Sequence, residues 1–164
     1  MTDNGREFLQ DPAFRLLLVI SLFGILFWTT LGHALAYYSD YIRATYGSSA
    51  YTGGFRFAHM HSTANSLVAG VASIALPLIT SIKRKLKTFL ALLFGLSLIS
   101  WNVGYIWAGL TTTTPTTAAF NTQLVIATNY WIIPISWLAS IAGGILFLAL
   151  LYDLIRKRPL KQGA

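Results

Sequence analysis

The 164-residue sequence contains no cysteine. This absence excludes disulfide bonds, thiolate ligands for zinc or iron–sulfur clusters, and a cysteine nucleophile. It carries no information about the redox state of the compartment, because the chain uses no thiols at all. Any chemistry that the protein performs must depend on other side chains or on a bound cofactor.

Charged residues are also scarce, at 10% of the chain against about 25% in typical soluble domains. The only acidic residues near the long hydrophobic stretches, Asp40 and Asp153, lie at the edges of those stretches. A proton-coupled transporter normally relies on a carboxylate at membrane depth, so this function is disfavoured. Glycosidase-like and metal-dependent hydrolase sites are disfavoured too, because they need paired carboxylates or several metal ligands.

Hydrophobic residues make up 55% of the chain, and the mean hydropathy is +0.60. Four continuous stretches each exceed the ~20 apolar residues that a helix needs to cross a bilayer. They cover residues 14–37, 55–82, 86–110 and 124–155. Their continuity favours helices over a membrane β-barrel. We therefore predict an all-α fold, an integral membrane four-helix bundle that forms a single domain over residues 1–164.

The residues at the ends of these stretches give further predictions. Residues 1–12 are polar and no small-residue cleavage site follows, so the first stretch is expected to remain as a membrane anchor. Pro77 and Pro134 are expected to kink or end the second and fourth helices. The segments 38–54 and 111–122 are expected to be loops, the first with aromatic rings at headgroup depth.

The net charge of +7 comes from basic residues that flank the hydrophobic stretches rather than forming one stripe. This distribution predicts membrane topology and no nucleic-acid partner. If all four stretches cross the membrane, ten of the 12 Lys and Arg residues fall on one side, and only Arg43 and Arg56 on the other. Both termini are therefore predicted to be cytoplasmic, in a multi-pass protein of the cell inner (cytoplasmic) membrane surrounded by lipid.

The segment AHMHSTAN, residues 58–65, places polar groups inside the second stretch. On a helix His59 and His61 point about 200° apart, so the two cannot bind one metal ion together. A single imidazole that faces a bundle interior is a suitable axial ligand for haem iron, and His33 is a third candidate. The alternative for each histidine is a hydrogen bond to a neighbouring helix.

Two amides accompany these histidines. Asn65 lies four residues after His61 and shares its helix face, and Asn102 lies in the segment WNVGY, residues 101–105. Together with hydroxyl groups and aromatic rings, the amides are suited to line one polar pocket. The alternative is that each amide only joins two helices, with Gly104 allowing close approach.

The run from Arg56 to Pro77 resembles the second helix of styrene oxide isomerases and of the related hydroxylaminobenzene mutases. Shared features are the Ala-His pair at residues 58–59, Asn65 six residues later, and Leu-Pro at residues 76–77. The segment 101–105 resembles the third helix of the isomerases, and the likeness covers roughly residues 52–150. The chain departs from the isomerases at His61, at Ser66 where they have glycine, and at Tyr105, one position before their functional tyrosine.

The resemblance implies a homotrimer in which His59 binds haem b, with His61 as an alternative ligand or supporting residue. Ferric iron would act as a Lewis acid that rearranges an aryl epoxide, a small apolar aromatic substrate, to an aldehyde. Asn65 would hold or polarise the substrate oxygen, while Asn102 and Tyr105 would shape the pocket. These assignments make the protein an intramolecular isomerase.

Two alternatives remain at this point. The first is a hydroxylaminoarene mutase on the same scaffold, which the sequence does not separate from the isomerase. The second is a non-catalytic or electron-carrying haem subunit of a membrane complex. In that subunit His33 and His59 would both bind the iron, leaving no open coordination site.

Overall fold

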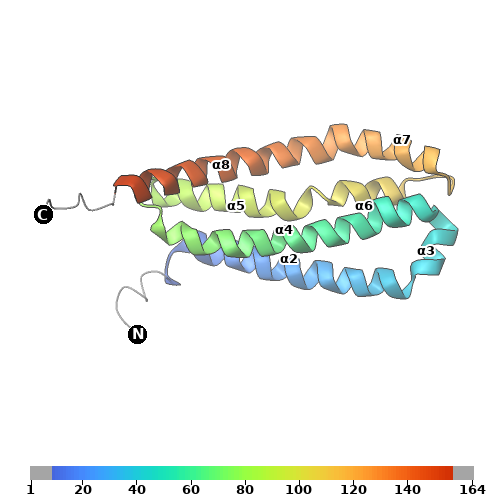
Figure 1. The fold of residues 1–164 in the computed structure, drawn as a ribbon, viewed down its shortest axis with the longest axis horizontal. Helices are drawn as coiled ribbons and strands as arrows, with labels where there is room; N and C mark the ends of the chain where they lie inside the picture. The colour runs from blue at the N-terminus through green and yellow to red at the C-terminus, as the bar shows by residue number, and fades with distance from the viewer. Residues whose placement is uncertain (1–8, 157–164) are drawn as a thin grey trace, which may run out of the picture.

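The computed structural model describes residues 9–156, which are helical apart from short connections (Figure 1). In chain order the elements are α2 (Pro12–Tyr37), α3 (Ser39–Tyr46), η1 (Ala50–Arg56), α4 (Phe57–Ala75), η2 (Leu76–Leu78), α5 (Arg84–Ser100), α6 (Val103–Leu110), α7 (Thr117–Ala127), η3 (Thr128–Ile132) and α8 (Ile133–Arg156). The segments η1 and η3 are π-helical, and η2 is a 3₁₀ turn. No strand occurs between residues 9 and 156, so the predicted all-α fold is confirmed.

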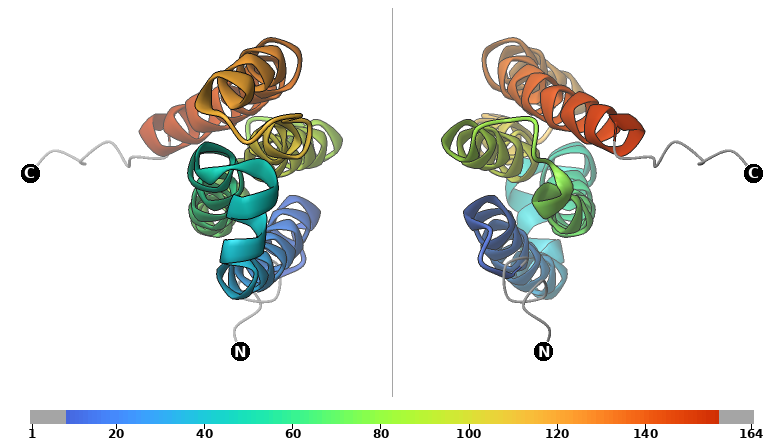
Figure 2. Two further views of the ribbon diagram at one scale, coloured as in Figure 1. Left: turned by 90° about the vertical axis from the view of Figure 1, so that its right-hand side faces the viewer. Right: turned by 90° about the vertical axis from the view of Figure 1, so that its left-hand side faces the viewer.

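The long helices lie side by side (Figures 1 and 2). Helices α2, α4 and α5 pack against one another, and α5 packs in turn against α8. Helix α6 continues α5, while α7 and η3 lead directly into α8. The start of α2, the start of α5 and the end of α8 meet at one end of the bundle, which we call the basic end (Figure 1). Its described basic residues are Arg15, Lys83, Arg84, Lys85, Lys87 and Arg156.

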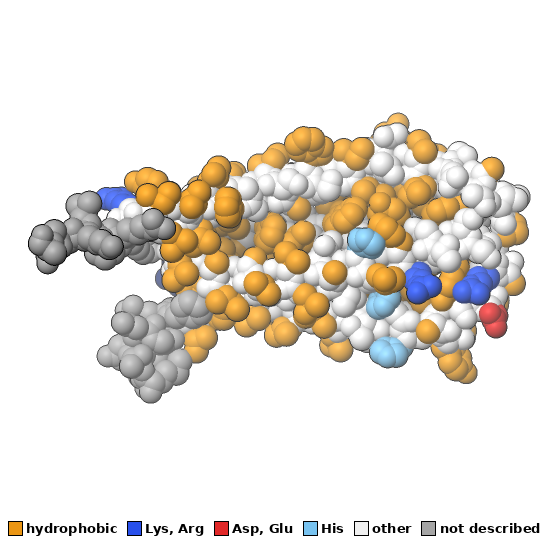
Figure 3. Space-filling view, in the orientation of Figure 1, with side chains coloured by type: hydrophobic (Ala, Val, Ile, Leu, Met, Phe, Trp, Pro, Cys, Tyr) orange, Lys and Arg blue, Asp and Glu red, His pale blue; other side chains and the backbone are white. Residues whose placement is uncertain are grey.

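Three helical stretches are long and apolar enough to cross a membrane, namely 12–37, 84–110 and 117–156. Helix α4 is not among them, because its first half carries His59, His61 and Asn65. Apolar side chains cover much of the visible surface of the bundle (Figure 3). A surface of this kind suits a lipid environment, since soluble monomers rarely expose large apolar patches.

The predicted loop over residues 38–54 was wrong, because most of this segment is helical. No glycine or proline interrupts residues 39–46, and these residues form α3. Gly47, at φ +88°, ends that helix, and η1 then leads directly into α4. The second outer connection is also shorter than expected, since α7 begins at Thr117 after Thr116 caps it by accepting a hydrogen bond from the Ala119 N–H.

The two prolines behave differently. Pro77 lies in the 3₁₀ turn that ends α4, as predicted for a residue that cannot continue a helix. Pro134 lies in the first turn of α8, where a missing N–H is tolerated, directly after the π-helical η3. The predicted single helix over 86–110 is interrupted at Trp101 and Asn102, which separate α5 from α6.

Buried ionic contacts hold the basic end together. The Lys87 ammonium donates to the Asp11 carboxylate at 2.5 Å and to the carbonyls of Leu76 and Ile79 at 3.1 and 3.0 Å. Asp11 also caps α2 by accepting hydrogen bonds from the Ala13 and Phe14 N–H groups. Burial raises the pKa of Asp11, but Lys87 and the two N–H groups outweigh this effect and hold the pKa below its ordinary value.

A second carboxylate secures the connection between η2 and α5. Asp153 of α8 accepts hydrogen bonds from the backbone N–H groups of Thr80 and Ser81, at 2.6 and 2.9 Å. The end of α8 is thereby fixed to the turn that follows α4. These hydrogen bonds hold the ends of α4 and α8 together at the basic end.

Candidate functional site

His59 of α4 faces α2. Its Nδ1 atom lies 2.5 Å from the carbonyl oxygen of Trp28. A carbonyl can only accept a hydrogen bond, so Nδ1 carries a hydrogen, and in the neutral imidazole Nε2 then holds the free lone pair. The half-buried imidazole is thus held in the tautomer in which Nε2 is the available metal ligand.

Gly32 gives the His59 ring its place against α2. A Cβ atom at position 32 would lie 2.6 Å from His59 Nδ1 and closer still to Cε1 and Nε2. Real Cβ atoms do not approach other heavy atoms so closely, and the nearest atoms belong to the ring itself. Only glycine at this position lets the imidazole reach the Trp28 carbonyl. Sequence analysis missed Gly32, because its contact with His59 joins two helices.

A cleft of about 260 Å³ opens beside the His59 ring. Its lining residues come from α2, η1 and α4: Gly32, Leu35, Ala36, Tyr51, Arg56, His59 and Met60. Arg56 ends the π-helical η1 and brings a cation to the cleft, three residues before His59. Ligand pockets usually enclose about 300–1,000 Å³, so a large ligand would extend beyond this cleft. Sequence analysis missed Arg56 as a residue of this cleft, although residues three apart on a helix, such as Arg56 and His59, lie on the same face.

His61 lies on the other side of α4. Its ring stacks on Phe57 with centroids 3.7 Å apart, and Phe57 in turn lies 4.5 Å from the ring of Tyr105. The Nδ1 atom of His61 contacts the Phe57 carbonyl at 3.0 Å, within its own helix. The predicted separation of His59 and His61 is confirmed, and Tyr105 belongs to the aromatic group beside His61.

Asn65 joins α4 to α5, since its Nδ2 atom donates to the Leu98 carbonyl at 3.1 Å. It therefore lies on the side of His61 and faces a different helix from His59. Within one chain, the structure does not bring Asn65 into the cleft that holds the His59 ring. Donation to Leu98 uses one of the two amide hydrogens of Nδ2 and leaves the second for another acceptor.

Asn102 and Ser62 are buried without hydrogen-bond partners. Asn102 lies at the break between α5 and α6 at 0% exposure, and neither its Nδ2 nor its Oδ1 has a partner among residues 9–156. The Ser62 hydroxyl of α4 is likewise 0% exposed and unpaired in this part of the chain. Most buried polar atoms in proteins are paired, so Asn102 and Ser62 are candidates for contact with a ligand or an ordered water. Sequence analysis missed Ser62, because helical serines commonly bond their own backbone, as Ser66 does.

His33 is exposed on α2, and its Nδ1 atom contacts the Thr29 carbonyl at 2.9 Å. It is not among the residues that line the cleft at His59. Within residues 9–156, no group of three or more His, Cys, Asp or Glu residues is placed to hold a metal ion. Haem iron does not need such a group, because the porphyrin coordinates the iron and the protein supplies only one or two further ligands.

His59, His61 and Asn65 border one surface of α4. The three histidines lie on the same face of the molecule, with basic side chains close by (Figure 3). Between the His59 side and the His61 side, α4 exposes a surface that we call the outer face of α4. It consists of Met60, Ala64, Leu67 and Val71. A ligand on this outer face would have an imidazole at one edge and an amide and aromatic rings at the other.

No protein-family model, curated protein or solved structure matches this chain.

Proposed function

We propose that the protein is a haem b-dependent membrane isomerase that rearranges an aryl epoxide to an aldehyde. The observation that carries this proposal is the His59 imidazole, whose Nδ1 is bonded to the Trp28 carbonyl while Nε2 remains available. Metal-binding histidines commonly donate their second ring nitrogen to a carbonyl in this way, which fixes the ring and raises its basicity.

The residues around His59 fit haem in a second respect. Arg56 supplies a cation to the same cleft, as an anionic propionate requires. The cleft is too small to enclose a porphyrin, so the outer face of α4 would also have to contact the group. In the proposed homotrimer, a neighbouring copy of the chain packed on that apolar surface would complete the site. Bound haem would supply a Lewis acid for the substrate oxygen.

The side chains opposite His59 suit a neutral aromatic substrate. Asn65 retains one amide hydrogen to donate to the epoxide oxygen, and the rings of Phe57 and Tyr105 offer an apolar surface for the aryl group. Asn102 is a buried amide without a partner and would orient the substrate. Breaking the benzylic C–O bond and shifting a hydride to that carbon yields the aldehyde without net oxidation, so no carboxylate acid or base is needed.

The proposed topology has four spans, with α4 as the additional crossing, and cytoplasmic termini in the inner membrane. The packing of α4 alongside both α2 and α5 supports this count. The meeting of the starts of α2 and α5 with the end of α8 at the basic end supports the orientation, since Lys and Arg accumulate on the cytoplasmic side (Figure 1).

Absorption spectroscopy of the detergent-purified protein tests the haem assignment. We expect a Soret band in the wild type, His61→Ala and His33→Ala, and its loss in His59→Ala. A high-spin spectrum with conversion of styrene oxide to the aldehyde is the expected result. Absence of haem in the wild type after reconstitution, or a Soret band in His59→Ala equal to the wild type, would overturn the proposal.

The same preparations separate the two alternatives. A hydroxylaminoarene mutase would break an N–O bond on the same scaffold, and turnover of hydroxylaminobenzene without turnover of epoxide identifies it. An electron-carrying subunit would give a low-spin spectrum that both His33→Ala and His59→Ala convert to high spin or abolish. In the structure His33 stands outside the His59 cleft, which favours the isomerase over the electron carrier.

A further inference from the structure

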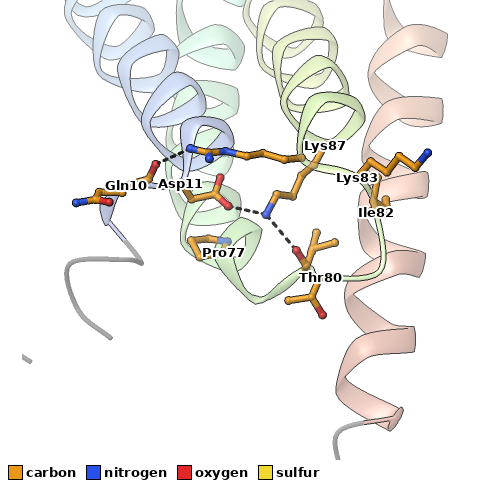
Figure 4. Close-up of a pocket in the computed structure, with 9 residues that line it drawn as sticks. Gln10, Asp11, Pro77, Thr80, Ile82, Lys83 and Lys87 are labelled. Atoms are coloured by element: carbon orange, nitrogen blue, oxygen red, sulfur yellow. Dashed lines mark hydrogen bonds and ion pairs between the residues drawn. The ribbon is translucent and has the colours of Figure 1, made fainter. Parts of the chain in front are cut away.

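The basic end contains a cavity of about 590 Å³, larger than the cleft at His59 (Figure 4). It lies between the residues that precede α2 and the connection from η2 to α5. Among the residues that line it are Gln10, Asp11, Ile79, Lys83, Arg84 and Lys87. None of these residues takes part in the proposed isomerase site.

The cations of this cavity are not equivalent. Lys87 is buried, and its ammonium is fully used by the Asp11 carboxylate and two carbonyls (Figure 4). Among residues 9–156, Arg84 makes a single long contact, in which its guanidinium donates to the Gln10 carbonyl at 3.4 Å. Lys83 is exposed, has no side-chain partner among residues 9–156, and extends away from Asp11 (Figure 4). Since Asp11 is neutralised by Lys87, the described lining residues keep two positive charges in excess, those of Lys83 and Arg84.

The backbone adds to this positive potential. Lys83 precedes the first residue of α5 and provides no side-chain cap for that helix. The first N–H groups of α5 lie at the same helix start as Lys83 and Arg84, so the positive end of the helix dipole adds to their charges. Such a combination of backbone donors and cations suits a phosphate group.

Apolar residues complete the cavity. Pro77, Ile79 and Ile82 line it together with the cations. Leu78 and Leu86, close by in the sequence, expose about half of their surface, at 48% and 50%. A soluble ion would leave this apolar surface unused, whereas a lipid would cover it with its glycerol and acyl groups.

We propose that this cavity binds a phosphate group, carried by an anionic phospholipid, with Arg84 and the first N–H groups of α5 as its ligands and Lys83 adding positive charge at the rim. Basic pockets between membrane helices at the cytoplasmic surface are suited to lipid headgroups. The bound lipid would join the start of α2 to the start of α5. This site is independent of haem and of the proposed isomerase activity.

Titration of the detergent-purified protein with phosphatidylglycerol, followed by native mass spectrometry, tests the proposal. We expect Lys83→Gln/Arg84→Gln to weaken binding on the order of 30-fold, because each Lys or Arg near an anionic lipid contributes roughly fivefold. The matched control is Lys85→Gln/Arg156→Gln, which removes the same charge from the basic end outside the cavity. It should bind phosphatidylglycerol within about twofold of the wild type, since more distant charges act weakly.

Two further arms identify the source of the phosphate. Phosphatidylcholine and inorganic phosphate should each bind far more weakly than phosphatidylglycerol, because one lacks net negative charge and the other lacks the apolar part. Inorganic phosphate that binds as well, with the same dependence on Lys83 and Arg84, would support the phosphate site but overturn its assignment to a lipid. Equal binding of phosphatidylglycerol by both double variants would overturn the site altogether.

Discussion

The basic end and the centre of the bundle treat buried polar groups in opposite ways. At the basic end, the Lys87 ammonium has three acceptors, and Asp153 accepts hydrogen bonds from two backbone N–H groups. At the centre, Asn102 and Ser62 are at least as deeply buried and have no partner among residues 9–156. Both regions belong to one packed structure, so depth of burial alone does not explain the difference.

We propose that this contrast separates polar groups with a structural role from those with a functional one. An unpaired buried amide or hydroxyl costs free energy, roughly 1–3 kcal/mol on mutational scales. The basic end avoids this cost, and its polar groups fix the connection between α4 and α5. The centre accepts the cost beside the face that carries Tyr105 and Asn65. Groups of this kind are suited to a ligand that supplies the missing partners.

We expect the largest loss of stability when the ion pair between Lys87 and Asp11 at the basic end is broken. Lys87→Met would leave Asp11 without its cation and the Leu76 and Ile79 carbonyls without their donor. Removing one partner of a buried ion pair costs about 3–5 kcal/mol. We expect a loss of this size in the free energy of unfolding, measured by denaturant titration in detergent.

The control for this change lies two residues earlier. Lys85→Met alters an exposed lysine of the same helix and should change the free energy of unfolding by less than about 0.5 kcal/mol. Equal stability of Lys87→Met and Lys85→Met would show that the contacts of the Lys87 ammonium do not hold the basic end together.

We expect a smaller loss of stability when the His59 imidazole, whose Nδ1 is bonded to the Trp28 carbonyl, is displaced. Gly32→Ala would place a Cβ atom against the His59 ring and push it from the Trp28 carbonyl. Overpacking of this kind costs about 1–3 kcal/mol, and we expect haem affinity to fall with it. The Soret absorbance during haem titration measures the affinity, and thermal unfolding measures the stability.

The chain offers a matched control for this glycine. A Cβ atom at Gly144 of α8 would meet no heavy atom within 4 Å, so Gly144→Ala should leave haem affinity unchanged. Unchanged haem affinity in Gly32→Ala as well would show that the His59 ring does not need its position against α2. The ligand assignment would then rest on His59→Ala alone.

The sequence was sufficient for features that depend on local spacing. Continuous apolar runs predicted the long helices, and the two-residue spacing predicted that His59 and His61 diverge. The pairing of Asp11 with Lys87 was missed, because these residues are 76 positions apart and no local pattern links them. The Trp28 carbonyl was missed for the same reason, since a backbone acceptor 31 residues away leaves no trace in side-chain chemistry.

Two other errors have local causes. Helix α3 was missed because tyrosine, serine and nearby glycines are typical of interfacial loops, whereas residues 39–46 themselves contain no helix breaker. The break at Asn102 was missed because the apolar run continues through it. Asn102 itself was identified as a candidate, since an amide at membrane depth is costly wherever the helix breaks.

The smallest effect on stability, and the sharpest on function, is expected at Asn102. Asn102→Leu replaces an unpaired buried amide with an apolar side chain of similar size, so the desolvation cost disappears. We expect the free energy of unfolding to stay level or to rise by about 1 kcal/mol, while epoxide turnover per bound haem falls. Asn65→Leu, which breaks the bond to the Leu98 carbonyl, should instead lose about 1 kcal/mol. If Asn102→Leu is less stable than the wild type and equally active, Asn102 is a structural group, and the contrast between the two regions does not mark function.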